Sequence, residues 1–198
     1  MQNYRQHIRV KTVRLKPTRQ IIFNFSLWLF FLTFLFAASV YAHGPTRQKV
    51  SESIEINAPA EKVWAIVGAY DKLHTWLPPV TKTEVIEGEP TKTGALRVVT
   101  VGDKSITEKL KAYKPEKMSL KYRITKGDIT LLPVTNYQST ISVKSLGEGK
   151  SKVTWAGAFY RGDPNNNPPE NLNDKAAISA VTGLYNVGLE NLKKIAEQ

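Results

Sequence analysis

Apolar and polar residues alternate over residues 50–56, which predicts a strand, and Asn57-Ala58-Pro59 then opens a helix predicted over residues 60–67. A second helical segment is predicted over residues 71–76, before Pro78 and Pro79. Six further strands, separated by turn residues, are predicted over residues 80–88, 95–101, 106–113, 118–125, 135–146 and 151–161. Apolar residues finally recur every three or four positions along a long helix that Asn173 or Asp174 caps.

This order of elements predicts an α+β fold. About seven antiparallel strands form a curved sheet, two short helices follow the first strand, and the long C-terminal helix covers the sheet. The apolar face of that helix contains small residues at Ala177, Ala180, Gly183 and Gly188. Glycine inside a helix costs about 1 kcal/mol, which suggests that space is needed between helix and sheet. Close packing of the helix on the strands is the alternative, and the sequence leaves both open.

The N-terminal segment determines where the protein is expected to work. Residues 1–20 carry six basic residues and no acidic one, residues 21–40 are almost wholly apolar, and Val40-Tyr41-Ala42 has the small residues of a cleavage site. These are the parts of a secretory signal peptide. Cleavage after Ala42 would leave residues 43–49 as an N-terminal extension and residues 50–198 as one domain in the periplasm. The apolar run is also long enough to span a bilayer, so an uncleaved inner-membrane anchor facing the periplasm is the alternative.

Charge narrows the range of partners. The whole chain has a formal net charge of +11, but residues 43–198 hold 22 Lys and Arg against 17 Asp and Glu, a net charge of +5. The charges are scattered and form no long basic run, so nucleic acid is not expected as a partner. An acidic protein or an anionic lipid surface remains open. A membrane is expected to be contacted only through an uncleaved leader.

Strand pairing predicts a polar row on the inner face of the sheet. A hairpin about Gly102-Asp103 pairs Arg97 with Glu108, and a five-residue connection over residues 113–117 pairs Glu108 with Tyr122 and Leu110 with Leu120. Side chains alternate between the two faces of a strand, so the polar residues share their face with apolar neighbours. Buried charges need each other, which favours an Arg97–Glu108 ion pair.

The last predicted hairpin adds aromatic residues to the same face, with Ile141 opposite Trp155 and Tyr137 opposite Phe159. An apolar wall with a few convergent polar groups is typical of a ligand pocket. Arg97 would then hold a carboxylate or carbonyl, Tyr122 a hydroxyl, and Trp155, Phe159 and Leu184 the hydrophobic body. The alternative is an internal ion pair that fixes the register of the sheet and binds nothing. With His74 and Trp76 at the expected mouth, the candidate ligand-binding residues are Arg97, Glu108, Tyr122, Tyr137, Trp155, Phe159, Leu184, His74 and Trp76.

Catalytic motifs are scarce. The chain has no cysteine, no serine in a nucleophile elbow, no glycine-rich phosphate loop and no His/Asp/Glu cluster with metal-ligand spacing. We therefore expect no catalysis, no cofactor and no metal. His74 as a general base is the enzymatic alternative, although a histidine beside Trp76 is more often a surface residue. If cleavage leaves His43 as the first residue, its amine and imidazole suit Cu(II), whereas a frayed terminus needs no metal.

Several segments resemble the START-like, or SRPBCC, superfamily, which includes the polyketide cyclase/dehydrase family. These segments are IEINAPAEKVW at residues 54–64, Trp76-Leu77-Pro78, Tyr122-Arg123-Ile124 and LYNVGLENLK at residues 184–193. The resemblance covers residues 50–195 and implies a helix-grip fold of the START/Bet v 1 type. It implies little about function, because members bind, carry or convert many hydrophobic ligands.

The leader followed by His43-Gly44-Pro45-Thr46, with no second domain expected, resembles more narrowly the MxaD-type proteins. These are exported single-domain members encoded with methanol oxidation systems. The resemblance implies an accessory factor that helps a periplasmic methanol dehydrogenase work with its cytochrome c acceptor, so a dehydrogenase or a cytochrome c is the expected protein partner. The contact surface would use residues 162–173, a proline- and asparagine-rich loop, and residues 76–79. The alternatives are a periplasmic carrier or sensor of a lipid or other small hydrophobic molecule, and a cyclase/dehydrase-like enzyme acting in the cavity.

Overall fold

The structure is a computed structural model that describes residues 44–198, so the predicted leader, its cleavage site and His43 lie outside the described residues. Within the described part of the chain, no helix is both long enough and apolar enough to cross a membrane. The elements are β1 (Gln48–Ile56), α2 (Ala60–Val67), η2 (Tyr70–Thr75), β2 (Lys82–Glu87), β3 (Leu96–Val101), β4 (Lys104–Lys114), η3 (Pro115–Lys117), β5 (Ser119–Lys126), β6 (Val134–Gly147), β7 (Lys150–Arg161), η4 (Glu170–Leu172) and α3 (Asp174–Ala196).

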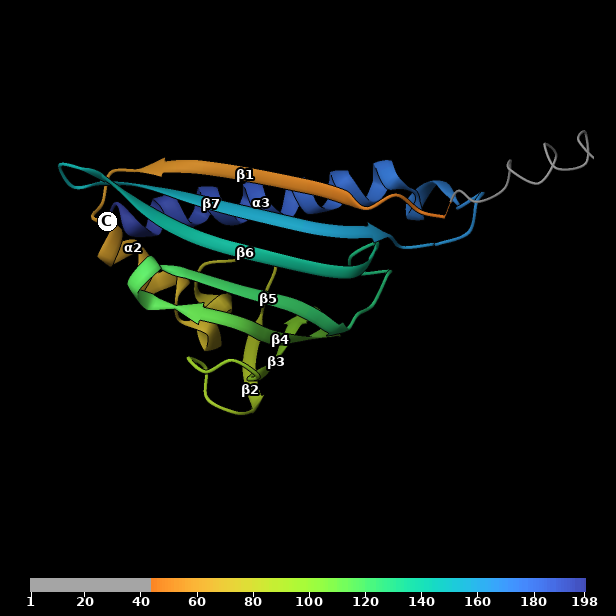
Figure 1. Cartoon of the computed structure of the whole chain (residues 1–198), viewed down its shortest axis with the longest axis horizontal. Helices are drawn as coiled ribbons and strands as arrows, with labels where there is room; N and C mark the ends of the chain where they lie inside the picture. Colours follow the sequence, from red (N-terminus) through yellow and green to blue (C-terminus); the bar gives the residue numbers. More distant parts are fainter. Residues whose placement is uncertain (1–43) are drawn as a thin grey trace, which may run out of the picture. The chain divides into compact units, whose positions relative to one another are not determined.

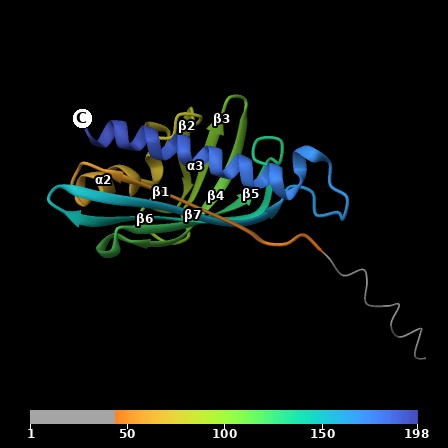
Figure 2. The same cartoon turned by 90° about the horizontal axis from the view of Figure 1, so that it is seen from above.

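The predicted α+β architecture is confirmed. One seven-stranded sheet has the order β1-β7-β6-β5-β4-β3-β2, and all of its neighbouring strands are antiparallel. The sheet curves so that β2 and β3 turn away from the long β6 and β7 (Figure 1). Helix α3 runs along the inner side of this curve, as the view from above shows (Figure 2).

Alternation along the strands determines which side chains face α3. On β7, every second residue from Ser151 to Phe159 is buried, and the residues between them are more exposed. Helix α3 begins at its predicted cap, where the Asn173 side chain accepts a hydrogen bond from the Ala176 amide at 2.9 Å. Near its other end, Lys193 donates to the Glu55 carbonyl at 2.7 Å. The helix is thereby fixed at both ends across the apolar face of the sheet.

The predicted register is right for one hairpin and wrong for the next. Arg97 lies opposite Glu108, as predicted, because the turn at Gly102 is a tight one. Glu108, however, lies opposite Ile124 and not Tyr122. The connection between β4 and β5 ends with Met118 in the left-handed conformation, and a bulge interrupts the pairing between Leu110 and Ala112. The resulting shift is two residues, an even number, so the predicted side chains keep their inner face.

The small residues of α3 have two different roles. A Cβ atom added at Gly188 would lie 2.8 Å from Cδ1 of Leu77 and 2.9 Å from Cζ3 of Trp155, so the helix is closely packed there. A Cβ atom added at Gly183 would meet nothing within 4 Å. Both alternatives left open by the sequence therefore apply: close packing at Gly188 and open space at Gly183.

This difference predicts opposite effects of the same substitution. Gly188→Ala should lower the free energy of unfolding, because overpacking a core costs about 1–3 kcal/mol and exceeds the gain of about 1 kcal/mol in helix propensity. Gly183→Ala should gain the same helix propensity without a steric clash, so its free energy of unfolding should be equal to or higher than that of the unmodified protein. Urea denaturation of both variants measures the two effects. A Gly188→Ala variant as stable as Gly183→Ala would contradict the close contact.

Candidate functional site

A cavity of about 400 Å³ lies between the inner face of the sheet and α3. This volume is within the range of small-molecule sites. Most of its walls are aliphatic side chains from η2 and the segment after it, the β3–β4 hairpin, the loop before β6 and α3, namely Leu73, Leu77, Val80, Val99, Val101, Ile106, Leu131, Leu132, Leu184 and Val187. Ala180 and Gly183 complete the α3 side. The groups with polar atoms in the lining are Glu108, Tyr122, Tyr137 and Trp155.

The candidate residues are divided by the structure into two groups. Glu108, Tyr122, Tyr137, Trp155 and Leu184 line the cavity, whereas Arg97, Phe159, His74 and Trp76 do not. The first group lies on the inner faces of four strands, β4 to β7, and on α3, as the periodicity of these elements predicted. The second group lies behind the lining or on the surface, for reasons specific to each residue.

Arg97 does not line the cavity, and each of its three guanidinium nitrogens contacts an oxygen atom of the protein. Its Nε and Nη2 atoms contact Oε2 of Glu108 at 2.7 and 2.6 Å, and Nη1 donates to the Tyr70 carbonyl at 2.6 Å. Its guanidinium carbon lies 4.0 Å from the ring centre of Tyr70 and 5.2 Å from that of Tyr122. The arginine expected to hold a ligand carboxylate therefore has its hydrogen bonds directed to Glu108 and Tyr70.

Phe159, Trp76 and His74 are explained by packing. Phe159 is fully buried and stacks on Tyr137, with ring centres 6.1 Å apart. Trp76 is buried edge-on against Trp155 at 5.4 Å. His74 lies exposed on η2, where its backbone amide donates to Thr83. The expected contact surface at residues 76–79 is smaller than the sequence suggested, because Trp76 and Leu77 are both buried.

A network of buried hydroxyl groups was missed at the level of the sequence. The Tyr185 hydroxyl lies 2.7 Å from that of Tyr137 and 2.8 Å from Oγ of Ser139. A Cβ atom at Gly157 would overlap the Tyr185 hydroxyl, so this glycine makes room for it. The helical period contained the signal: Tyr185 lies four residues after Val181, on the same face of α3. Tyr185 also stacks on Trp155, with ring centres 4.3 Å apart.

The buried tyrosines stay neutral. Burial raises the pKa of Tyr122 and of Tyr137 well above the ordinary value of 10, and it raises the pKa of Tyr185 to about 12. The Tyr122 hydroxyl accepts a hydrogen bond from the Trp155 indole at 3.1 Å. Among residues 44–198 there is no cluster of side chains with metal-ligand composition.

The loop at residues 162–173 is held in place from β7. Arg161 donates from Nε to the Asp163 carbonyl at 2.8 Å and from Nη2 to the Asn165 carbonyl at 2.7 Å, and its Nη1 contacts Asp174 at 3.2 Å. The asparagines at 165–167 are exposed. Arg161 thus fixes the loop to the end of β7, and the loop presents exposed polar side chains.

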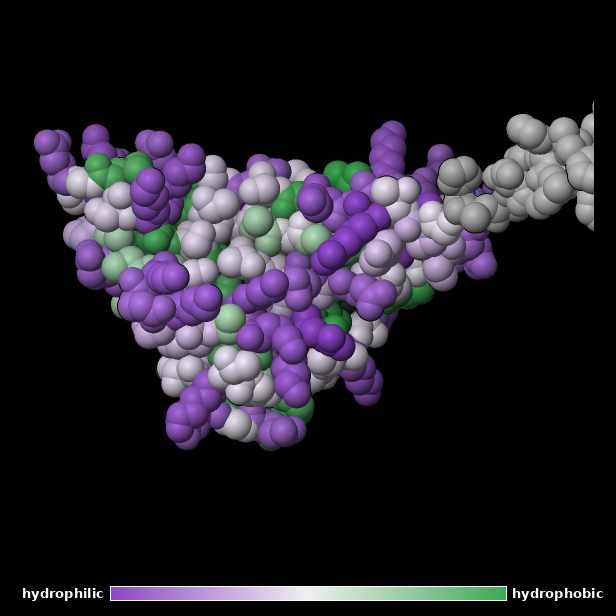
Figure 3. Space-filling view, in the orientation of Figure 1, coloured by the Kyte–Doolittle hydropathy of each residue, from purple (hydrophilic) through white to green (hydrophobic). Residues whose placement is uncertain are grey.

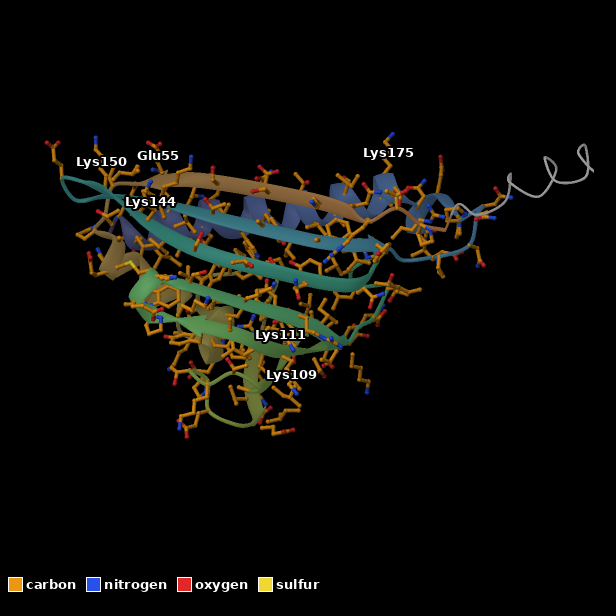
Figure 4. The ribbon with its side chains drawn as sticks, viewed as in Figure 1. Glu55, Lys109, Lys111, Lys144, Lys150 and Lys175 are labelled. Atoms are coloured by element: carbon orange, nitrogen blue, oxygen red, sulfur yellow. The ribbon has the colours of Figure 1, made fainter. Side chains whose placement is uncertain are left out.

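A basic patch covers the outer face of the sheet on β4 and β5, and consists of Lys109, Lys111, Lys121 and Arg123. Lys109 lies directly opposite Arg123, and Lys121 is paired with Ala112, beside Lys111. None of the four forms an ion pair with another residue in the described part of the chain. The outer face is largely hydrophilic (Figure 3), and Lys109 and Lys111 lie close together on it, far from Glu55 (Figure 4).

The comparisons with known proteins agree with the fold. Residues 47–197 match the family model described as polyketide cyclase / dehydrase and lipid transport. An uncharacterized protein from Bacillus thuringiensis is 29% identical, with a TM-score of 0.64 over 76% of this chain and 100% of its own. XoxI from Bacillus cereus is also 29% identical, with a TM-score of 0.63 over 75% of this chain and 94% of its own. A search of curated proteins found no match.

The ZhuI aromatase/cyclase from Streptomyces sp. R1128 is 16% identical, with a TM-score of 0.60 over 77% of this chain and 94% of its own. At this identity the likeness shows the fold alone. In total, 302 chains of solved structures match, and a fold so widely shared does not assign an activity.

The raised tyrosine pKa values predict how stability depends on pH. Above pH 10 the unfolded chain releases tyrosine protons that the folded chain retains, so the free energy of unfolding should fall as the pH rises from about 10 to 12, by about 1.4 kcal/mol per pH unit for each such tyrosine. Below pH 10 these groups should have no effect. Denaturation at a series of pH values, together with the absorbance of tyrosinate, measures this.

Tyr70→Phe is the matched variant for this measurement. Burial raises the pKa of Tyr70 as well, and its buried hydroxyl has no hydrogen-bond partner. The variant should therefore lose stability less steeply above pH 10 without losing stability at neutral pH. An unchanged slope would show that Tyr70 ionises in the folded protein.

Proposed function

Because the chain belongs to the polyketide cyclase / dehydrase and lipid transport family, we propose that it binds a small hydrophobic molecule in the cavity beneath α3 and does not convert it. The observation that carries this proposal is the cavity itself: about 400 Å³ with an almost wholly apolar lining. Each 100 Å² of apolar ligand surface removed from water contributes about 2.5 kcal/mol. An apolar cavity of this size therefore favours a hydrophobic ligand.

The absence of catalysis is inferred from how the polar groups are used. Glu108 accepts a hydrogen bond from Arg97, the Tyr137 hydroxyl is hydrogen-bonded to that of Tyr185, and the Tyr122 hydroxyl accepts a hydrogen bond from the Trp155 indole. A general acid or base needs a proton to exchange near neutral pH, and burial holds the pKa of Tyr122 and Tyr137 well above 10. His74, the candidate base, does not line the cavity.

We also propose that the domain acts in the periplasm, on the basis of the leader predicted at residues 1–42. A second candidate function follows from the MxaD-type resemblance: an accessory factor that docks on a periplasmic dehydrogenase or its cytochrome c. The 29% identity to XoxI and the basic patch support it. Like charges directly opposite on neighbouring strands destabilise a sheet, so the patch is better suited to binding an acidic surface than to stabilising the fold.

Filling the cavity should abolish ligand binding. Ala180 lines the cavity from α3, so Ala180→Phe should weaken binding of the neutral fluorophore N-phenyl-1-naphthylamine at least tenfold, about 1.4 kcal/mol. The matched control is Asn186→Phe, which adds the same ring at an exposed position of α3 that does not line the cavity. Equal binding by both variants would place the fluorophore outside the cavity.

Native mass spectrometry of the protein from its own host would then identify what the cavity holds. We expect a discrete small adduct that Ala180→Phe lacks and Asn186→Phe retains. Incubation with the extracted molecule should return it unchanged. A chemically altered product would overturn the non-catalytic part of the proposal.

The accessory role makes a separate prediction about the basic patch. Lys109→Glu/Arg123→Glu should weaken association with the host's methanol dehydrogenase or cytochrome c at least tenfold at low salt, because the charges steer and orient an acidic partner. The control Lys175→Glu/Lys194→Glu makes the same change of net charge on α3 (Figure 4). If both pairs weaken association equally, only net charge matters and the patch is no docking site.

A further inference from the structure

We propose that the cavity selects hydrophobic molecules that carry a hydroxyl group, held between Glu108 and Tyr122, and that it discriminates against carboxylates. This inference rests on the proposed ligand-binding function and names the chemical class of the ligand. The sequence suggested that Arg97 would bind a carboxylate or carbonyl of the ligand. In this inference the ligand instead donates a hydrogen bond to Glu108.

The two carboxylate oxygens of Glu108 differ in their partners. Both contacts from Arg97, at 2.7 and 2.6 Å, go to Oε2. The other oxygen, Oε1, receives no hydrogen bond from any described residue. The Glu108 side chain is only 5% exposed, yet the residue lines the cavity. Oε1 is not among the fully buried side-chain atoms that lack a hydrogen-bond partner, so it remains accessible from the cavity. A ligand that donates to this oxygen makes a charge-assisted hydrogen bond, which is stronger than one between neutral groups.

The Tyr122 hydroxyl is available to donate a hydrogen bond into the cavity. Its oxygen accepts from the Trp155 indole at 3.1 Å, and no other described residue lies within 3.5 Å in hydrogen-bonding geometry. The Tyr137 hydroxyl is the next polar group beside it. Tyr122 also lines the cavity. A phenol that has accepted one hydrogen bond still has its own proton to donate, so the cavity offers one donor as well as one acceptor.

The donor and the acceptor lie at the same end of the cavity. Leu110 is opposite Tyr122, and Glu108 is two residues from Leu110 on the same strand. Glu108 and Tyr122 are therefore diagonal neighbours on one face, which long and aromatic side chains can bridge. Arg97 contacts both, by its ion pair with Glu108 and by lying 5.2 Å from the Tyr122 ring centre. A hydroxyl group is the simplest group that donates to Glu108 and accepts from Tyr122 at once.

The charges around the cavity account for the discrimination against carboxylates. Arg97 does not line the cavity, and its three guanidinium nitrogens each direct one N–H group to Glu108 or to the Tyr70 carbonyl. A carboxylate entering the cavity would meet the free oxygen of Glu108 and no exposed cation among the lining residues. Desolvating an unpaired anion is costly, and the like charge of Glu108 adds to that cost.

Three molecules with one aromatic body test this inference: naphthalene, 2-naphthol and 2-naphthoate, titrated calorimetrically at neutral pH. We expect 2-naphthol to bind about ten- to hundredfold more tightly than naphthalene, since hydrogen bonds to a charged group are strong. We expect 2-naphthoate to bind more weakly than naphthalene. Equal binding of naphthol and naphthalene, or tightest binding of naphthoate, would overturn the inference but leave the proposed function intact. Failure of all three to bind would count against both.

Substitutions test whether Tyr122 and Glu108 cause the preference for 2-naphthol over naphthalene. Tyr122→Phe should reduce the preference for 2-naphthol over naphthalene several-fold, and Tyr70→Phe, a buried tyrosine that does not line the cavity, should leave it unchanged. Arg97→Met/Glu108→Leu removes both charges together and avoids a single unpaired one; it should abolish the preference while retaining naphthalene. If that double variant does not fold, Tyr122→Phe against Tyr70→Phe still decides, and equal preferences in those two would overturn the inference.

Discussion

The contact between α3 and the inner face of the sheet is the constraint on which the rest of the structure depends. A single helix cannot fill a curved sheet along its whole length, because its face is straight and the sheet is not. At Gly188 the helix approaches so closely that a Cβ atom would lie 2.8 Å from Leu77. At Gly183, which lines the cavity, a Cβ atom would meet nothing from the sheet or from another side chain within 4 Å. The cavity exists where this contact ends, so the packing that stabilises the fold also determines where a ligand can bind.

Buried polar groups fix this arrangement more sharply than apolar packing alone. Arg97 joins β3 to β4 through Glu108 and reaches the Tyr70 carbonyl on η2. Tyr185 joins α3 to β6 through Tyr137 and Ser139. Each of these bonds has a directional requirement that a sliding helix or strand would break, and a broken one would leave a buried group unpaired. The polar groups therefore specify position, whereas the apolar surface supplies most of the free energy.

The sequence predicts what depends on local periodicity and fails where a single residue interrupts it. The order of the elements, the cap at Asn173 and the Arg97–Glu108 pairing follow from periodicity and a tight turn. The pairing of β4 with β5 does not, because a bulge and the left-handed Met118 shift it. Nor does the contact of Arg97 with Tyr70, since no pattern relates residues from such separate segments. Tyr185 was predictable in principle from the helical period, but Leu184 beside it fitted the apolar pattern equally well.

The family and the fold are compatible with both ligand binding and catalysis. The few polar groups that line the cavity therefore decide between the two. A cavity becomes an active site when a group in it can exchange a proton or attack a substrate near neutral pH. In this chain the partners of Tyr137 and Glu108 lie within the protein, and the free capacity is one oxygen of Glu108 and one proton of Tyr122. One free acceptor and one free donor are enough to orient a ligand. Under the proposed function, burial keeps Tyr122 neutral and Arg97 holds Glu108 in an ion pair, so both groups would act on a ligand through hydrogen bonds.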